Sequence, residues 1–462
     1  MDDQAIELLR QGLDASDQGK YAQAVTLMTS AIALAPKAAQ AYFCRGATHC
    51  DNGNYDSAIA DFQRSIELDP TLSMAHRGIG VAYYKAGQFQ SAIAQQNLAL
   101  ERDSSNADAW SDRGLTCFEL GLFEEALSDF NEAVQRDPNA AMAHVNRGRA
   151  YDKLGDPFRA VGDFNQALLI DPTYGIAYYH RAQAHRALGE RQAAIADLEV
   201  AMVRMPQFAG SYVERGQMME EMRDTARAFA DYSKAIDLDP TLSTARLHRG
   251  NLYRNVGDLQ GAIADYTAGL EKSPKSATLA FYRGVTQTEL GQWKAALDDY
   301  SLALDSDPTM VNALINRAIL YGRERAHNSA LTDLNQAAKL KPNQPDIYYN
   351  RGLIYQSDGD NGRAIADFTK VLDLSPNYIP ALINRGNCHM GEEAFDSAIA
   401  DFEAAIRLEP SQPLAQANLG RAFLGKGDRI KGRDTLQLAA TLAFNQGQMQ
   451  LHQQILEAFK TA

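Results

Sequence analysis

Cysteine is scarce in this 462-residue chain, and no long apolar run occurs. The four cysteines have no metal-binding or redox spacing, so we expect reduced thiols in a reducing compartment; they are Cys44, Cys50, Cys117 and Cys388. No stretch approaches the roughly 18 apolar residues that cross a bilayer. No basic start precedes an apolar core, which argues against a secretory signal. We therefore expect a cytoplasmic protein without membrane insertion.

Basic residues are also outnumbered, with 45 Lys and Arg against 58 Asp and Glu and a net charge of −13. This balance argues against nucleic-acid binding, which needs a basic footprint. Histidines are few and scattered, and His180 and His185 are five residues apart, which is not a metal-ligand spacing on one helix face. No glycine-rich phosphate loop follows a strand-like segment. The sequence thus predicts no enzyme, no metal and no cofactor.

Proline, in contrast, is strictly periodic. Its intervals are 34 residues or twice 34, and the one vacant position holds Ser104. The periodic prolines are Pro36, Pro70, Pro138, Pro172, Pro206, Pro240, Pro274, Pro308, Pro342, Pro376 and Pro410. A period this strict indicates one structural unit copied head to tail.

The chain can be divided into thirteen consecutive segments of 34 residues, called frames, which together cover residues 5–446. Positions are counted from the first residue of each frame. Twelve frames are clear and the thirteenth is degenerate, since it lacks the periodic proline and Leu436 replaces the usual aromatic residue. The frames start at Ala5, Ala39, Ser73, Ala107, Ala141, Gly175, Ala209, Ser243, Ala277, Val311, Pro345, Ile379 and Pro413. Residues 447–462 are predicted to form a C-terminal helix that caps the last apolar face.

Four frame positions predict a helix, a tight turn and a second helix. Position 8 is glycine or alanine in all frames, which indicates a close approach by neighbouring backbone, with alanine at position 20 opposite. An aromatic residue at position 24 fills the space beside them. Glycine at position 15 suits the left-handed end of the first helix. The residue before proline ends the second helix.

This pattern of small, alanine, aromatic and proline positions resembles the tetratricopeptide repeat family. The resemblance implies an all-α, right-handed superhelical solenoid of about thirteen helix-turn-helix repeats. It also implies that first helices line a concave groove and second helices form the convex back. The third frame, 73–106, departs most among the internal frames, because Gln96 replaces the aromatic residue and Ser104 the proline.

Arginine at position 7 and aspartate at position 23 occur in the same ten frames. Their joint absence from frames 1, 3 and 13 predicts an ion pair between the two helices of one repeat, such as Arg215 with Asp231 and Arg249 with Asp265. The alternative is a spiral of arginines that binds a polyanion. We favour the structural pair, because charges near a core must be paired.

The groove-facing positions, as the family implies them, hold the candidate binding residues. Asparagine recurs at position 6, at Asn146, Asn316, Asn350, Asn384 and Asn418. These residues resemble the asparagine ladder in the superhelical arm of O-linked N-acetylglucosamine transferases, which implies contact with an extended peptide backbone. The alternative is that asparagine is simply common at this position.

A second candidate is a basic patch beside an acidic one. Arg149, Lys153, His180 and Arg186 should face the groove, and the next frame follows with Glu214, Glu220 and Glu221. Such neighbours would fix the register of a charged partner, and ordinary solvated groove surface is the alternative.

The sequence therefore predicts a non-catalytic scaffold that binds a partner protein or an extended peptide in its groove. Two other functions remain open. One is an architectural subunit of a large assembly, and the other is the targeting subunit of a separate enzyme. The oligomeric state stays open as well.

Overall fold

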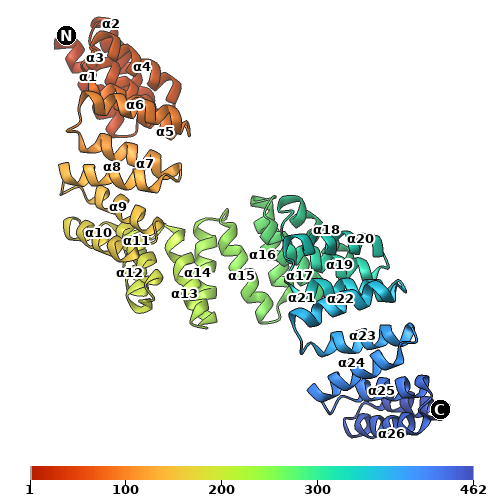
Figure 1. Ribbon diagram of the computed structural model, residues 1–462. Helices are drawn as coiled ribbons and strands as arrows, with labels where there is room; N and C mark the ends of the chain where they lie inside the picture. The colour runs from red at the N-terminus through yellow and green to blue at the C-terminus, as the bar shows by residue number, and fades with distance from the viewer. Residues whose placement is uncertain (1–2, 461–462) are drawn as a thin grey trace. The chain divides into compact units, whose positions relative to one another are not determined.

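The computed structural model describes residues 3–460, and these form 27 helices and no strands (Figure 1). The chain divides into two compact units, Met1–Asp239 and Pro240–Ala462, each built from consecutive helix pairs. The all-α fold class is confirmed, while the single solenoid over 5–446 and its right-handed course stay predictions.

The helix bounds follow the frames. In the first unit they are α1 (Asp3–Asp17), α2 (Tyr21–Leu34), α3 (Ala39–Asp51), α4 (Tyr55–Leu68), α5 (Ser73–Lys85), α6 (Phe89–Arg102), α7 (Ala107–Glu119), α8 (Phe123–Arg136), α9 (Ala141–Lys153), α10 (Pro157–Ile170), α11 (Gly175–Ala187), α12 (Arg191–Arg204), α13 (Ala209–Glu221) and α14 (Thr225–Leu238). In the second unit they are α15 (Ser243–Asn255), α16 (Leu259–Lys272), α17 (Ala277–Glu289), α18 (Trp293–Ser306), α19 (Val311–Arg323), α20 (His327–Leu340), α21 (Pro345–Ser357), α22 (Asn361–Leu374), α23 (Ile379–Gly391), α24 (Phe395–Leu408), α25 (Pro413–Lys426), α26 (Arg429–Asn445) and α27 (Met449–Lys460). From α3 to α25, every first helix begins at the first residue of its frame.

The turn between the two helices of a repeat is left-handed in every frame. Glycine supplies it in ten frames, with φ from 70° at Gly19 to 93° at Gly427. In the other three frames Arg223, Arg325 and Glu393 adopt φ of 61°, 59° and 55°. A side chain in this region costs about 1–2 kcal/mol, so packing of the two helices imposes the turn even where the residue disfavours it.

The small residue at position 8 makes room for the aromatic ring at position 24 of the same repeat. A Cβ added at Gly114 would lie 2.6 Å from the Phe130 ring, and one added at Gly250 would lie 2.5 Å from the Tyr266 ring. The sequence suggested an approaching backbone as the main reason for the glycine, whereas the ring is the nearer neighbour. These rings are almost fully buried, so each contributes roughly 1.5–3 kcal/mol.

An ion pair joins the two helices of each repeat that carries Arg and Asp. Arg215 Nη2 lies 2.7 Å from Asp231 Oδ1, and Arg249 Nη2 lies 2.7 Å from Asp265 Oδ1. In both pairs Nε donates to the second carboxylate oxygen. The same two-bond geometry occurs in all ten frames, with Nη2–Oδ1 distances of 2.6–2.8 Å. The carboxylates are therefore fully engaged inside each repeat.

The last helix, α27, packs on α26. Ile455 is fully buried there, in a cluster with Leu436 and the flanking Leu451 and Phe459. This contact covers apolar surface at the end of the second unit, as a cap does. Residues 461–462 of the predicted cap lie outside the described part. Within 3–460 no helix has the length and apolar character needed to cross a membrane.

Candidate functional site

The first helices of successive repeats contact one another as well as their own second helix. Such contacts link α3 to α5, α7 to α9 and α9 to α11 in the first unit, and α19 to α21 in the second. Their remaining surface forms a shared face to which each repeat contributes a few side chains. Pockets on this face combine residues of several repeats.

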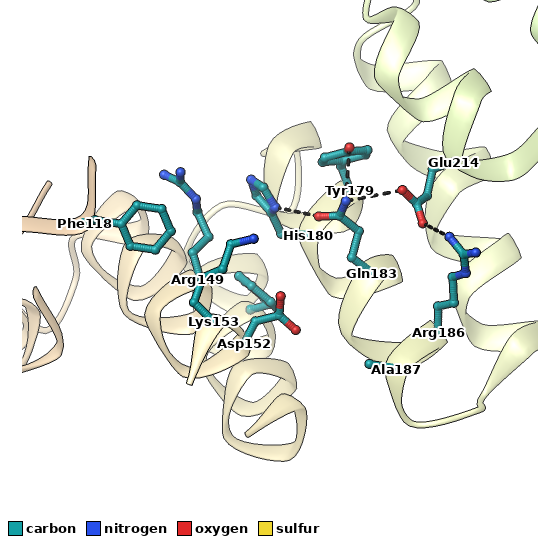
Figure 2. A pocket seen from close by; sticks show the side chains of 11 residues that line it. Phe118, Arg149, Asp152, Lys153, Tyr179, His180, Gln183, Arg186, Ala187 and Glu214 are labelled. Carbon is teal, nitrogen blue, oxygen red and sulfur yellow. Dashed lines mark hydrogen bonds and ion pairs between the residues drawn. The ribbon is translucent and has the colours of Figure 1, made fainter. Parts of the chain in front are cut away.

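One such pocket lies in the first unit and has a volume of about 600 Å³. Its lining comes mainly from the first helices of four successive repeats, α7, α9, α11 and α13. The predicted residues Arg149, Lys153, His180 and Arg186 all line it, together with Glu214 (Figure 2). The structure thus brings the proposed basic and acidic groups into one site.

One end of the pocket carries two cations. The Arg149 guanidinium lies 4.6 Å from the centre of the Phe118 ring, and its Nη1 donates to Asn146 Oδ1 at 3.3 Å. Lys153 is exposed. Within residues 3–460 neither side chain forms an ion pair with a carboxylate. Burial raises the pKa of the nearby Asp152 carboxyl, while Lys153 opposes this shift.

His180 lies between the two ends and is not a cation at neutral pH. Burial, reinforced by the charges of Arg149 and Lys153, lowers its pKa to about 4. Its Nδ1 bonds Gln183 Oε1 at 3.1 Å, and its ring stacks on Phe164 with the centroids 6.0 Å apart. The sequence counted His180 in the basic patch; the structure corrects this, because a charged imidazole would be poorly solvated here.

At the other end of the pocket, the charged side chains form ion pairs with one another. Arg186 Nη1 lies 2.6 Å from Glu214 Oε1, and its Nη2 lies 2.5 Å from Glu221 Oε1. Gln183 Nε2 donates to Glu214 Oε2 at 3.3 Å and to the Tyr179 hydroxyl at 3.1 Å (Figure 2). Arg186 is therefore already paired, and the unpaired positive charge is confined to the Arg149 and Lys153 end.

The asparagines of position 6 occupy different settings. Asn316 and Asn350 line a second pocket, of about 430 Å³, together with Phe281 and Tyr282. Asn350 Nδ2 donates to the Asp346 carbonyl at 2.7 Å, and Asn316 Nδ2 donates to the Tyr300 hydroxyl at 3.4 Å. Their amide nitrogens therefore have partners within the chain.

The other three asparagines differ again. Asn384 Nδ2 donates to the Tyr349 hydroxyl at 3.2 Å, and Asn418, only 7% exposed, donates to Asn387 Oδ1 at 2.9 Å. Asn146 is 5% exposed, and its Nδ2 is buried without a hydrogen-bond partner among residues 3–460. The ladder stays a prediction.

Several lining residues escaped the sequence interpretation. Phe118, Asp152, Tyr179 and Gln183 all lie in the first pocket. Each occupies a frame position that the family assigns to the groove, so the same rule would have found them. Sequence alone offered no reason to select them, because their roles depend on ring contacts and hydrogen bonds between repeats. No three His, Cys, Asp or Glu side chains between residues 3 and 460 are grouped as metal ligands.

Comparisons with known proteins identify the repeat. A tetratricopeptide repeat model matches residues 9–73, 77–141, 247–311 and 384–428, about half of the chain. Other models of this repeat match 141–174, 326–359 and 345–378. No curated protein matches the chain.

Similar solved structures share low identity with this chain. The APC/C hetero-tetramer Cut9-Hcn1 is 16% identical, with a TM-score of 0.43, and 90% of this chain and 96% of that chain are covered. Yeast Tom70 is 18% identical, with a TM-score of 0.35 and coverage of 99% and 95%. The type IV pilus biogenesis factor PilW is 22% identical, with a TM-score of 0.42 and coverage of 45% and 96%. At these TM-scores the structures carry no information about what this chain binds.

Proposed function

The chain belongs to the tetratricopeptide repeat family, and from this premise we propose that it is a non-catalytic scaffold that holds an extended segment of a partner protein. The observation that supports the proposal is the 600 Å³ pocket, because four successive repeats build it and its cations without a carboxylate partner among residues 3–460, Arg149 and Lys153, lie at one end. An acidic side chain of the partner would meet Arg149 and Lys153.

The aromatic side chains of the pocket supply the apolar part of this recognition. Phe118, Phe164 and Tyr179 line the site together with the charged groups. Rings bury large apolar area at low cost in conformational entropy, while a few charged groups set orientation. The pocket thus favours a peptide with an acidic residue followed or preceded by an apolar one.

A peptide display library screened against the full chain tests this function. We expect enriched peptides to carry an acidic residue, and the Arg149→Ala/Lys153→Ala variant to bind them more weakly by a factor of about a hundred or more, since hydrogen bonds to charged groups contribute about 1.5–3 kcal/mol each. Lys234→Ala, which removes an exposed cation from α14, serves as the control and should bind normally. Equal binding by the double variant would refute this use of the pocket.

In the second unit we propose that Asn316, Asn350 and Asn384 hold the backbone of the same partner. Asn418 would have to rotate away from Asn387 to take part. Changing all four to alanine should weaken binding of a long partner peptide, because each contact to its backbone contributes about 0.5–1.5 kcal/mol, and circular dichroism should show that the helices are retained. Unaltered binding by the fourfold variant would eliminate the ladder but leave the first pocket untouched.

A further inference from the structure

His180 presents an unprotonated ring nitrogen to the pocket of the first unit. Its Nδ1 donates to Gln183 Oε1 at 3.1 Å, and an amide oxygen can only accept, so Nδ1 carries the proton of the neutral ring. The other nitrogen, Nε2, therefore has a lone pair. Figure 2 shows Nε2 on the side of the ring that faces away from Gln183, towards Arg149. Within residues 3–460 this nitrogen has no hydrogen-bond partner.

The neighbouring repeat fixes which nitrogen of His180 carries the proton. Gln183 Nε2 donates to Glu214 Oε2 at 3.3 Å and to the Tyr179 hydroxyl at 3.1 Å. Because a carboxylate only accepts, the Gln183 amide must turn its oxygen towards His180. Arg186 in turn holds Glu214, with Nη1 at 2.6 Å from Oε1. This series of bonds, from α13 to α11, keeps Nε2 as the acceptor at neutral pH.

Two cations stand beside this acceptor. The positive charges of Arg149 and Lys153 both act on His180, since each lowers the pKa of its ring. The site therefore offers two charged donors and one neutral acceptor. A carboxylate or a sulfate can bind the donors but brings no proton for Nε2 at neutral pH. A phosphate monoester, whose second pKa is about 6, can satisfy all three groups, because one of its oxygens keeps a proton.

Aromatic rings lie directly against these polar groups. The Phe118 ring has the Arg149 guanidinium 4.6 Å from its centre, and the centroid of the Tyr179 ring lies 5.1 Å from that of His180. The anion-binding groups and the apolar lining are thus interleaved. A ligand that joins an aromatic ring and an anion in one side chain matches this arrangement. The volume of about 600 Å³ lies in the range of pockets that enclose such groups.

We propose that the pocket binds a phosphotyrosine side chain of the partner, with phosphoryl oxygens on Arg149 and Lys153 and the phosphoryl proton on His180 Nε2. This inference rests on the proposed function, because it specifies the acidic group that the pocket takes. The proton lies between a phosphoryl oxygen and Nε2. Its transfer to Nε2 leaves a phosphoryl dianion beside an imidazolium, and the total charge is the same in both forms. Binding of the dianion therefore takes up a proton from water.

Other charged groups around His180 must be separated from this proton. Those that line the pocket are Arg149, Asp152 and Lys153 on α9, Arg186 on α11 and Glu214 on α13. On α10, Phe164 brings an uncharged ring to His180, and on α12 Asp197 pairs with Arg181 at 2.6 Å. Arginine and lysine keep their charges from pH 6 to pH 8. A sulfate ester of the same shape meets the same surroundings, including Asp152, so the ratio of the two affinities isolates the shared proton.

Titration calorimetry on the full chain tests the proposal with a short alanine-rich peptide that carries one phosphotyrosine, sulfotyrosine or glutamate. We expect the phosphotyrosine peptide to bind about tenfold more tightly than the other two at pH 6, and its advantage over sulfotyrosine to fall about tenfold between pH 6 and pH 8. His180→Gln should remove this fall. Arg149→Ala/Lys153→Ala should weaken both sulfotyrosine and phosphotyrosine binding, and Lys234→Ala should change neither. Circular dichroism establishes that each variant is folded.

The possible failures are distinguishable. An affinity ratio that stays constant with pH in the wild type, or one that still falls in His180→Gln, would overturn the proposal. A glutamate peptide that binds as tightly as the phosphotyrosine peptide would refute the phosphoryl preference and leave the proposed function in place. Failure of all three peptides to bind would refute both. Inorganic phosphate that competes as strongly as the phosphotyrosine peptide would also overturn the proposal, because it would assign the site to free phosphate.

Discussion

Arg113 Nη1 donates a hydrogen bond of 2.7 Å to Asn97 Oδ1 in the preceding repeat. The same guanidinium holds Asp129 of its own repeat through Nε and Nη2. One side chain therefore joins three helices and crosses the boundary between two repeats. The equivalent residues Thr29, Asn131, Asn165, Thr267, Ser301, Asn335 and Thr369 accept from the arginine of the following repeat in the same way.

Removal of the two interactions of Arg113 should have unequal effects on stability. Asn97→Ala removes only the bond between repeats and should cost about 0.5–1.5 kcal/mol of unfolding free energy. Arg113→Ala should cost about 3–5 kcal/mol, since it leaves the buried Asp129 carboxylate without its counter-ion. Urea unfolding measures both values.

Two control variants separate these two contributions to the free energy of unfolding. Gln63→Ala changes the same frame position before a repeat that has Ile79 in place of arginine, so it should be nearly neutral. Arg113→Ala/Asp129→Ala should cost less than the sum of its two single changes. Simple additivity would mean that the pair contributes no coupling energy.

We expect Gln96 to make the third repeat less stable than its neighbours. It is 1% exposed, and its Nε2 donates to Thr116 Oγ1 at 2.9 Å and to the Asp112 carbonyl at 3.2 Å. Its Oε1 is buried without a hydrogen-bond partner in the described part of the chain. Gln96→Phe should stabilise the protein by about 1–3 kcal/mol, because it removes this unpaired group and restores the ring that faces glycine in other repeats.

Hydrogen exchange locates this effect. In the wild type, α5 and α6 should exchange faster than α7 and α8, and Gln96→Phe should slow exchange in α5 and α6. The control Gln90→Phe places a ring on the exposed side of α6 and should bring no gain. Equal protection of the third and fourth repeats in the wild type would contradict the prediction.

His180 makes stability depend on pH. Its pKa of about 4 in the folded chain lies below the ordinary 6.5, so the neutral ring is favoured on folding. The resulting stability is complete above pH 6.5 and is lost as the pH falls towards 4, by up to about 1.4 kcal/mol per pH unit. His180→Gln should flatten the decline in urea midpoint between these values.

His144 provides a control, because its effect on stability should change with pH in the opposite direction. Its hydrogen bond with Asp163 raises its pKa, so its contribution is present below pH 6.5 and lost as the pH rises through the raised value. His144→Gln should therefore lower stability at pH 5 more than at pH 8. If both variants shift the profile in the same direction, the assignment of the two histidines is wrong.

The 34-residue period predicted the helices closely, because spacing alone dictates where a repeated unit begins. Thus α7 starts at Ala107 and α21 at Pro345, both first residues of their frames. A contact that occurs in only one repeat could not be predicted by comparing the frames with one another. Arg77 Nε, for example, lies 2.6 Å from Asp112 Oδ2 in the next repeat, and no other frame within residues 3–460 has an ion pair at these two positions.

In the pocket, the sequence predicted that Arg149, Lys153, His180 and Arg186 share one face, but not their charge state. Arg149 and Lys153 face the site because their frame positions place them there. The neutrality of His180 and the pairing of Arg186 with Glu214 arise from burial and from contact with the following repeat. Neither cause can be deduced from one frame, since both depend on how closely neighbouring repeats approach.

The contact between the aromatic ring and glycine, as between Phe130 and Gly114, involves two residues of the same repeat. A mutation of the ring or of the glycine therefore requires a matching change in the other residue. A pocket residue such as Lys153 takes no part in this contact. Natural selection could therefore change the ligand preference of one repeat at a time while the interior stayed constant. Duplication of a whole 34-residue segment would extend the binding face without requiring any new interior to evolve.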